Sequence, residues 1–326
     1  MPANIAKVKG TPSPTKELAP LNWGKRIAPL LIILAGVCWG IIGLFSRNLA
    51  TGGLSSVQIT ASRCIVTAVC LSTFLLIKDR DKLKINLKDL WLFLGTGICS
   101  IVFFNICYFT TIKLATLSMA SILLYTAPCF VMIMSAILFR EPITMRKIGA
   151  LVLAFGGCVL ITGILGKGGP SNLSGLAIIT GLGAGIGYAL YSIFGSIALR
   201  KYHPFTVTAY TFIVASLSLL PFSNSIDIVT IALENRNVLI SGLLLGVVST
   251  LIPFLLYTKG LEHMEAGKAS VMAFVEPMVA TLVGILIFKE QLTAQNILGI
   301  FLIFSSVLVL NWRTRQKMDR GTEPVS

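Results

Sequence analysis

The sequence predicts an all-α integral membrane protein whose ten transmembrane helices form two inverted five-helix repeats. Three observations predict this fold: an apolar composition, recurrent apolar windows of about 20 residues, and a constant offset between similar residues in the two halves. The chain is 55% hydrophobic and only 12% charged, with a mean hydropathy of +0.86. A soluble domain needs about a quarter of its residues charged, so the bilayer is the expected solvent.

The apolar windows define the predicted elements in chain order. The first window follows a basic, Pro-containing segment and is longer than the core of a typical signal peptide, so it is expected to remain as the first span. The predicted parts are an N-terminal tail (1–26), a first repeat (27–165), a linker (166–173), a second repeat (174–311) and a C-terminal tail (312–326). The ten predicted spans are 27–46, 57–77, 90–110, 116–139, 147–165, 174–197, 205–222, 238–257, 268–288 and 295–311.

The basic residues predict the orientation. If the N-terminus is cytoplasmic, 21 of the 27 Lys and Arg residues fall on the cytoplasmic side and Arg63 falls inside a span. The positive-inside rule therefore predicts a multi-pass protein of the cytoplasmic membrane with both termini in the cytoplasm. The net charge of +14 is explained by this topology, and no nucleic-acid partner is expected because the charges form no continuous face. Five basic residues are left outside: Arg47, Lys113, Lys167, Arg236 and Lys289.

The two halves align with a shift of 149 residues, most clearly around the fourth span of each half. Because each unit has an odd number of spans, the second copy enters the membrane upside down relative to the first. Inverted repeats are typical of transporters, in which the two copies exchange conformations. Ala120, Ser121, Pro128, Phe139, Glu141 and Thr144 fall on Ala269, Ser270, Pro277, Phe288, Glu290 and Thr293.

Short motifs recur in a fixed order along the chain. They are Trp39-Gly40, Arg63, Tyr125-Thr126-Ala127-Pro128, Glu141, Glu276-Pro277 and Glu290. In order, spacing and duplication they resemble the EamA-like ten-helix branch of the drug/metabolite transporter superfamily over residues 27–311. The resemblance implies a secondary transporter of a small metabolite such as an amino acid or a nucleobase, often an exporter. Proton coupling, facilitated diffusion and exchange all remain open.

Glu276 and Arg63 are the ionisable residues predicted well inside spans. Such residues usually face a cavity or a partner, because burying a charge costs at least a few kcal/mol. If the two side chains pair, they form a structural staple or a gate. If they do not, burial favours the protonated carboxyl, and Glu276 becomes a candidate proton carrier. Helix packing for Glu276 and snorkelling to the outer headgroups for Arg63 are the alternatives.

Further residues are predicted to build a central site or to let it move. Pro128 and Pro277 interrupt matching helices and are candidate hinges, although a static bend is an equal alternative. Glu141 and Glu290 end their helices beside Arg140 and Lys289, which predicts solvated ion pairs. The predicted cavity residues supply aromatic and polar groups, each with ordinary packing as its alternative. They are Trp39, Arg63, Asn105, Tyr108, Tyr125, Thr126, Tyr188, Tyr191, Ser192, Tyr257 and Glu276.

No catalytic residue, metal or cofactor is predicted. The seven cysteines lie in apolar windows without a CxxC pair, and the two histidines lie at helix ends. A nucleotide-binding P-loop is missing, so gradients are the expected energy source. An intramembrane enzyme would need paired acids or a metal motif. A lipid or polyprenyl-carrier flippase subunit and a multidrug exporter would share the fold and remain alternatives. The expected partners are the bilayer and a small-molecule substrate, for a monomer or a homodimer.

Overall fold

A computed structural model describes residues 23–164 and 174–319 of the protein, with side chains described from residue 24 to residue 312 within these ranges. The described residues are helical and contain no strand. Most of the two predicted tails, and nearly all of the predicted linker 166–173, lie outside these ranges.

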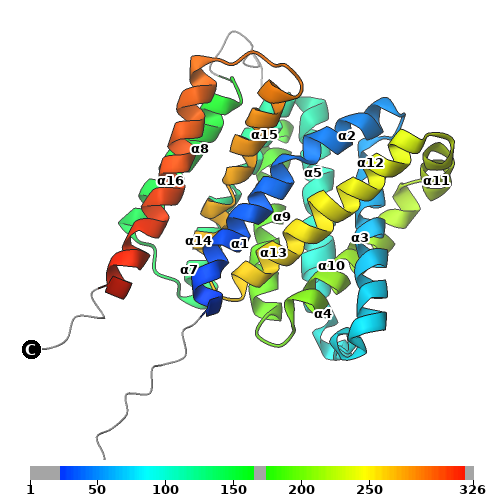
Figure 1. Ribbon diagram of the computed structural model, residues 1–326, viewed down its shortest axis with the longest axis horizontal. Helices are drawn as coiled ribbons and strands as arrows, with labels where there is room; N and C mark the ends of the chain where they lie inside the picture. The colour runs from blue at the N-terminus through cyan, green and yellow to red at the C-terminus, as the bar shows by residue number, and fades with distance from the viewer. Residues whose placement is uncertain (1–22, 165–173, 320–326) are drawn as a thin grey trace, which may run out of the picture.

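The first repeat contains five spans, of which three are broken into shorter helices (Figure 1). Two 3-10 turns, η1 (Arg80–Leu83) and η2 (Leu87–Asp89), precede the third span. The spans are α1 (Trp23–Gly40) with α2 (Ile42–Thr51); α3 (Ser56–Lys78); α4 (Leu90–Leu94) with the π-helical segment η3 (Gly95–Val102) and α5 (Phe103–Leu114); α6 (Leu117–Leu124) with α7 (Ala127–Phe139); and α8 (Met145–Ile161).

The second repeat follows the same plan, with one additional short helix, α11 (Ser225–Glu234), before its third span. Its spans are α9 (Gly175–Ala198); α10 (Pro204–Leu219) with η4 (Leu220–Phe222); α12 (Arg236–Gly246) with the π-helical segment η5 (Val247–Leu251) and α13 (Ile252–Leu261); α14 (Ala266–Met272) with α15 (Val275–Leu286); and α16 (Ala294–Asp319). Nine segments of the described chain are long and apolar enough to cross a membrane. The 17-residue helix α8 completes the predicted ten.

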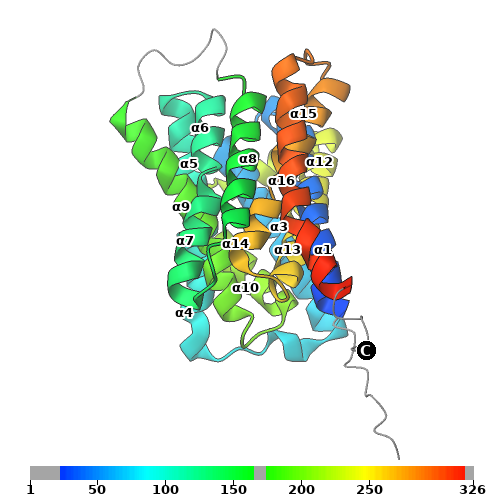
Figure 2. The same ribbon diagram turned by 90° about the vertical axis from the view of Figure 1, so that its left-hand side faces the viewer.

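The arrangement of the helices confirms the inverted repeat. Helix α5 packs on α9 and the equivalent α13 packs on α1, while α8 and α16 lie side by side at one edge (Figures 1 and 2). Helix α1 begins on the face of the molecule where α16 ends, which we call the terminal face. Helix α9 begins on the other side, which we call the opposite face (Figure 2).

Helix ends repeat with the same offset. Thr144 accepts a hydrogen bond from the backbone N–H of Lys147, and the equivalent Thr293 accepts one from Asn296, so α8 and α16 begin in the same way. Arg140 is the C-cap of α7 and Lys289 lies just beyond the end of α15, and their φ angles are 56° and 58°. Because non-glycine residues rarely adopt positive φ, this shared backbone geometry is strong evidence for the repeat.

The fourth span of each repeat is broken, as Pro128 and Pro277 predicted. The break lies at residues 125–126 between α6 and α7, and at residues 273–274 between α14 and α15. Each proline lies within the first turn of the second helix, where its missing N–H costs no helical hydrogen bond. Whether the breaks act as hinges stays a prediction.

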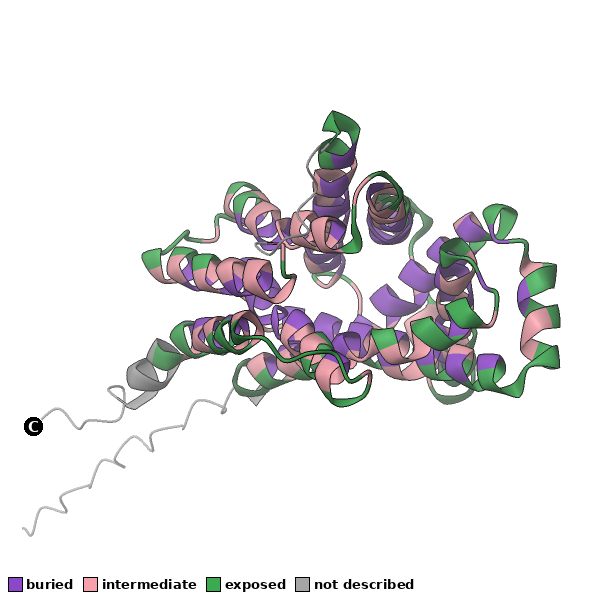
Figure 3. Cartoon of the chain, turned by 90° about the horizontal axis from the view of Figure 1, so that it is seen from above, coloured by how far each residue is buried: buried purple, intermediate pink, exposed green. Residues whose placement is uncertain are grey.

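The outer surface of the helix bundle is apolar. Phe301 on α16, Ile137 on α7 and Ile179 on α9 are 63%, 73% and 69% exposed. Seen along the helix axes, buried residues gather toward the middle of the bundle and exposed residues lie outside (Figure 3). In water such a surface would drive aggregation, whereas in a bilayer it contacts lipid.

Candidate functional site

A central cavity of about 80 Å³ lies between helices of both repeats. Seven of the predicted site residues line it, including both ionisable ones. They are contributed by α1, α3, α9, α13 and α15. These residues are Trp39, Arg63, Tyr188, Tyr191, Ser192, Tyr257 and Glu276.

Arg63 and Glu276 reach this cavity from different repeats. Arg63 lies on α3, about two turns after the Ser55 N-cap. Glu276 is the second residue of α15, directly after the break in the ninth span. Among the described residues no ion pair within 4.0 Å joins them, and Arg63 Nε is buried without a hydrogen-bond partner. The two opposite charges therefore share a cavity without a direct ion pair, and the buried Arg63 Nε donor is costly unless a ligand satisfies it.

Glycine on α1 fixes the backbone around Glu276. A Cβ at Gly36 would lie 3.3 Å from the backbone nitrogen of Glu276 and 3.3 Å from the carbonyl oxygen of Ala273. A side chain at this position would press on the break in the ninth span, so glycine lets helix α1 approach the break closely. The equivalent Gly185 on α9 faces the break in the fourth span, beside Thr126. The repeat thus places both breaks beside the cavity.

Aromatic rings form one wall of the cavity. The centroid of Trp39 lies 5.3 Å from that of Phe254 and 5.4 Å from that of Tyr257. Tyr191 packs edge-on against Phe254 at 5.0 Å. Edge-to-face contacts at these distances are favourable and rigid, so the wall offers a preformed flat surface for an apolar or aromatic group.

Hydroxyl groups in this wall are already satisfied by protein partners. The hydroxyls of Tyr191 and Thr258 are 2.7 Å apart, and those of Ser192 and Tyr257 are 2.8 Å apart. These bonds join α9 to α13 across the interior. The rings of Tyr191 and Tyr257 are thereby held in place, and the charged groups and the Tyr188 hydroxyl can provide polar recognition.

A smaller cavity of about 20 Å³ adjoins the first and lies between the two helix breaks. The predicted residues Tyr125, Pro128 and Pro277 line it, and it shares Tyr188 and Glu276 with the central cavity. Glu276 therefore sits where both cavities meet, so a change at either break would move its surroundings.

Three predicted cavity residues pack against the protein instead. Asn105 accepts a hydrogen bond from Thr60 at 3.3 Å and donates to a carbonyl one turn before it. The Tyr108 hydroxyl lies 3.2 Å from that of Ser121, and Thr126 donates to the carbonyl of Leu123 at 2.6 Å. None of the three lines the central cavity. Ordinary packing, the alternative given for each of them, describes these contacts.

The sequence analysis missed several lining residues. Ser100 lines the cavity from η3, and Phe104 follows on α5. Phe254 lines it at the position equivalent to Asn105. One feature of the sequence could have pointed to this region: Gly97 and Gly246 are equivalent in the two repeats. Gly97 lies within the π-helical segment η3, and Gly246 directly precedes the π-helical segment η5. Such segments often occur at functional sites.

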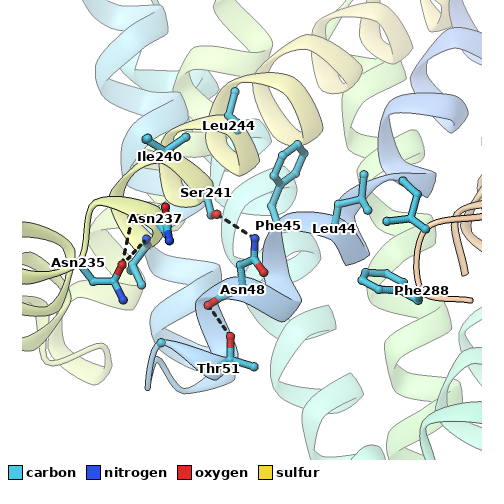
Figure 4. Close-up of a pocket in the computed structure, with 13 residues that line it drawn as sticks. Leu44, Phe45, Asn48, Thr51, Asn235, Asn237, Ile240, Ser241, Leu244 and Phe288 are labelled. Carbon is cyan, nitrogen blue, oxygen red and sulfur yellow. Dashed lines mark hydrogen bonds between the residues drawn. The ribbon is translucent and has the colours of Figure 1, made fainter.

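A larger hollow of about 580 Å³ lies on the opposite face between α2, α12 and the end of α15 (Figure 4). Its polar lining largely serves the helices themselves. Asn48 donates to Ser241 at 3.4 Å, and Asn235 caps the first turn of α12. No charged side chain in the described part of the chain lines this hollow. The central cavity is therefore the better candidate site despite its smaller volume.

The predicted solvated ion pair of Glu141 with Arg140 is wrong. The Glu141 side chain is only 12% exposed and contacts Lys147 at 3.8 Å. Its carboxylate oxygens accept hydrogen bonds from the backbone N–H groups of Ala266 at 2.9 Å and Gly267 at 3.2 Å. Sequence spacing could not reveal these partners, because they lie in the other repeat. Glu290, in contrast, is exposed.

Two stretches of the chain, residues 26–163 and 175–312, match the model of the EamA-like transporter family. The chain belongs to this family. The matched stretches coincide closely with the two five-span repeats, so each repeat of this EamA-like protein is one copy of the family domain. The protein is accordingly a multi-pass membrane transporter and not an enzyme.

Relatives of this EamA-like protein are similar over nearly their full length. An uncharacterized transporter of Archaeoglobus fulgidus is 27% identical, covering 86% of this chain and 97% of the relative. An uncharacterized inner membrane transporter, YicL, of Salmonella typhimurium is 25% identical, covering 90% and 97%. A solved crystal structure superimposes with a TM-score of 0.73 at 17% identity, covering 89% of this chain and 98% of the other, which supports the fold.

Proposed function

We propose that this protein is a secondary transporter for a small zwitterionic or polar aromatic metabolite, such as an amino acid or a nucleobase, bound between Arg63 and Glu276. One observation carries the proposal: two opposite charges share a cavity and are not paired with each other. Buried charges that lack partners are costly, and a ligand with complementary groups removes that cost when it binds.

The cavity chemistry fits such a ligand in three parts. The planar guanidinium of Arg63 suits a carboxylate or a ring carbonyl. The Glu276 carboxylate suits an ammonium or a ring N–H group. The wall of Trp39 and Phe254 suits an apolar or aromatic body. A ligand much larger than 80 Å³ fits only if the cavity widens. Movement at the helix breaks near Pro128 and Pro277 would allow this widening.

The proposed direction is export, with the terminal face in the cytoplasm. Basic residues support this orientation: Lys78 ends α3, Arg80 begins η1, and Lys201 lies between α9 and α10. Helix α3 ends on the terminal face (Figure 1). Export itself rests on the family resemblance. Glu276 would carry a proton if it is neutral in one half of the cycle and charged in the other, because a buried carboxyl changes its charge with its surroundings.

A ligand-stability screen tests the proposal. The purified protein is heated with amino acids, nucleobases, sugars and long-chain amphiphiles in turn, because a ligand of the folded state raises the melting temperature by mass action. One compact polar class should raise it, with about 2.7 kcal/mol of stabilisation at 100 times the Kd. Arg63→Gln and Glu276→Gln should each lose most of the shift, whereas Glu234→Gln, an exposed carboxylate outside the cavity, should keep it.

The same screen separates the alternatives. Shifts with long-chain amphiphiles alone would contradict the metabolite proposal and favour lipid-carrier flipping or multidrug export. A positive compound is then tested for uptake into proteoliposomes with and without a proton gradient, which shows whether transport is coupled. Monomer and homodimer are both compatible with a cavity built within one chain.

A further inference from the structure

The two broken spans meet on the terminal face. Helix α7 packs against α14 there, and the carboxylate of Glu141 at the end of α7 accepts the first two N–H groups of α14, from Ala266 and Gly267. Helix α14 has no side-chain cap of its own. A carboxylate at a helix N-terminus forms charge-assisted bonds and favourable dipole interactions. Glu141 thus joins one repeat to the other on the terminal face.

The equivalent contact on the opposite face is not made. The repeat relates α7 to α15 and α14 to α6, so the matching interface would join α15 to α6. No comparable interface joins these two helices in the part of the chain that the structure describes. Glu290, the counterpart of Glu141, is exposed and has no hydrogen bond or ion pair from its carboxylate among the described residues.

The partners for Glu290 are nevertheless present on α6. The N–H groups of Leu117 and Ser118 are equivalent to those of Ala266 and Gly267. Thr116 caps α6 but accepts only from the third N–H group, that of Met119, at 3.2 Å. The first two N–H groups of α6 are therefore left without an acceptor among the described residues. Those of α14 would be in the same position without Glu141.

The contact surfaces are also complementary in size. On the terminal face a Cβ at Gly267 would lie 3.4 Å from the Ser135 hydroxyl oxygen, so this interface pairs one glycine with one serine. The counterparts of these two residues are Ser118 and Gly284. The opposite interface would again pair one glycine with one serine, on exchanged helices. A closed contact of α6 with α15 would therefore have the same small-residue spacing as the one already seen.

We propose that Glu141 and Glu290 are alternating latches: Glu141 closes the terminal face, as in this structure, and in the other transport state Glu290 closes the opposite face by accepting the N–H groups of Leu117 and Ser118. This inference rests on the proposed transporter function, and it requires the two latches to exclude each other. The central cavity near Glu276 lies between them, so each latch would seal one route to it.

The latches differ in strength. Lys147 pairs with Glu265 at 2.6 Å and lies 3.8 Å from Glu141, so an ammonium group strengthens the terminal latch. The counterpart of Lys147 is Asn296 and that of Glu265 is Thr116, both neutral. The Glu290 latch therefore lacks the ionic partner, and the substrate-free protein rests with the terminal face closed.

Spin-label distances in nanodiscs test the latches without any substrate, so their failure is separate from a failure of the proposed substrate class. Labels at Leu117 and Ile287, 61% and 54% exposed, report the separation of α6 from α15. Of the native cysteines, the fully buried Cys64 and Cys158 stay and the other five are replaced. With both native glutamates, Glu141 and Glu290, the two labels should show mainly the long distance between α6 and α15.

Glu141→Gln should raise the ratio of short to long distances about tenfold, because an amide accepts these bonds without the charge. Adding Glu290→Gln to that variant should remove the gain, and adding Glu234→Gln, which changes an exposed carboxylate on α11, should not. No short population in Glu141→Gln, or equal effects of the Glu290 and Glu234 changes, would overturn the proposal.

Disulfide trapping keeps the test decisive if Glu141→Gln does not fold. The pair Ser118→Cys with Gly284→Cys should cross-link under mild oxidation, and Glu290→Gln should slow that reaction. The matched pair Ser135→Cys with Gly267→Cys, whose positions are already in contact, should cross-link in either background. Cross-linking of the matched pair alone would overturn the proposal.

Discussion

At the central cavity the first repeat carries Arg63 on α3, whereas the equivalent position on α10 of the second repeat is Phe212. The second repeat carries Glu276 at the start of α15, where the first has Ala127. Phe212 and Ala127 are 0% and 1% exposed. Backbone features, in contrast, are shared, such as the two helix breaks and the positive φ angles at both helix ends.

This difference separates two kinds of residue. Positions kept in both repeats shape the scaffold, because an inverted pair of helices must satisfy the same packing twice. Positions that differ are free of that requirement, so one repeat can place a charged group in the site where the other keeps a buried apolar residue. The comparison predicts that substitutions at Phe212 lower stability and leave ligand binding intact, whereas those at Glu276 and Arg63 weaken ligand binding without lowering stability.

The largest expected effect is on stability, from Phe212→Ala. The side chain is fully buried and its ring lies 4.8 Å from that of Phe254. Removing it leaves a cavity that costs about 3–5 kcal/mol, which should lower the melting temperature by roughly 10 °C. Phe301→Ala, at a 63% exposed position on the bilayer side, is the control and should change it by little. A ligand-induced shift that survives in Phe212→Ala supports the scaffold role; its loss would contradict the division between the repeats.

The next effect is on transport, from Glu276→Gln. The substitution keeps the shape and removes the only carboxylate that lines the central cavity among the described residues. Transport in proteoliposomes should fall about 100-fold, equal to ~2.7 kcal/mol, with a melting temperature close to that of the wild type. Glu234→Gln should transport normally. Wild-type rates for Glu276→Gln across pH 5.5 to 8 would exclude both substrate binding and proton coupling at this residue.

The sequence predicted most of the scaffold, because apolar windows and the 149-residue offset report helices and their repetition directly. It also predicted that Arg63 and Glu276 line a cavity, because charged side chains inside spans avoid lipid, and both line the central cavity. Asn105 and Thr126 were predicted to line the cavity but bond within the protein. Their residue types are equally suited to both roles, and helical spacing does not give the rotation of one helix against the next. The Glu141 contact with α14 was also hidden, because it joins segments more than a hundred residues apart.

A smaller effect, of opposite sign for stability and binding, is expected from Arg63→Met. Arg63 Nε is buried and has no hydrogen-bond partner among the residues that the structure describes, and an unsatisfied buried donor costs about 1–3 kcal/mol. Methionine fills similar space without that cost, so the substrate-free protein should melt about 2–4 °C higher while the ligand-induced shift is lost. Arg47→Met removes an arginine that lies 4.3 Å over the Phe288 ring and should not raise the melting temperature. A less stable Arg63→Met that still binds ligand would refute the assignment.

The smallest expected effect concerns the start of the second span in each repeat, which is α3 in the first repeat and α10 in the second. Ser55 caps α3 through a hydroxyl that does not titrate, whereas His203 Nδ1 accepts the N–H of Phe205 at the start of α10, at 3.3 Å. Partial burial, together with Lys82 and Lys259 and despite Glu262 and Asp79, lowers the pKa of His203 below 6.5.

Just below pH 6.5 the unfolded chain therefore binds a proton that the folded protein does not, so stability should fall as the pH decreases. His203→Asn keeps a capping acceptor that does not titrate. Between pH 7.5 and 5.5 the wild type should lose about 1 °C more in melting temperature than this variant, as measured by differential scanning fluorimetry. A variant that loses as much as the wild type would show that the cap of α10 is as insensitive to pH as that of α3.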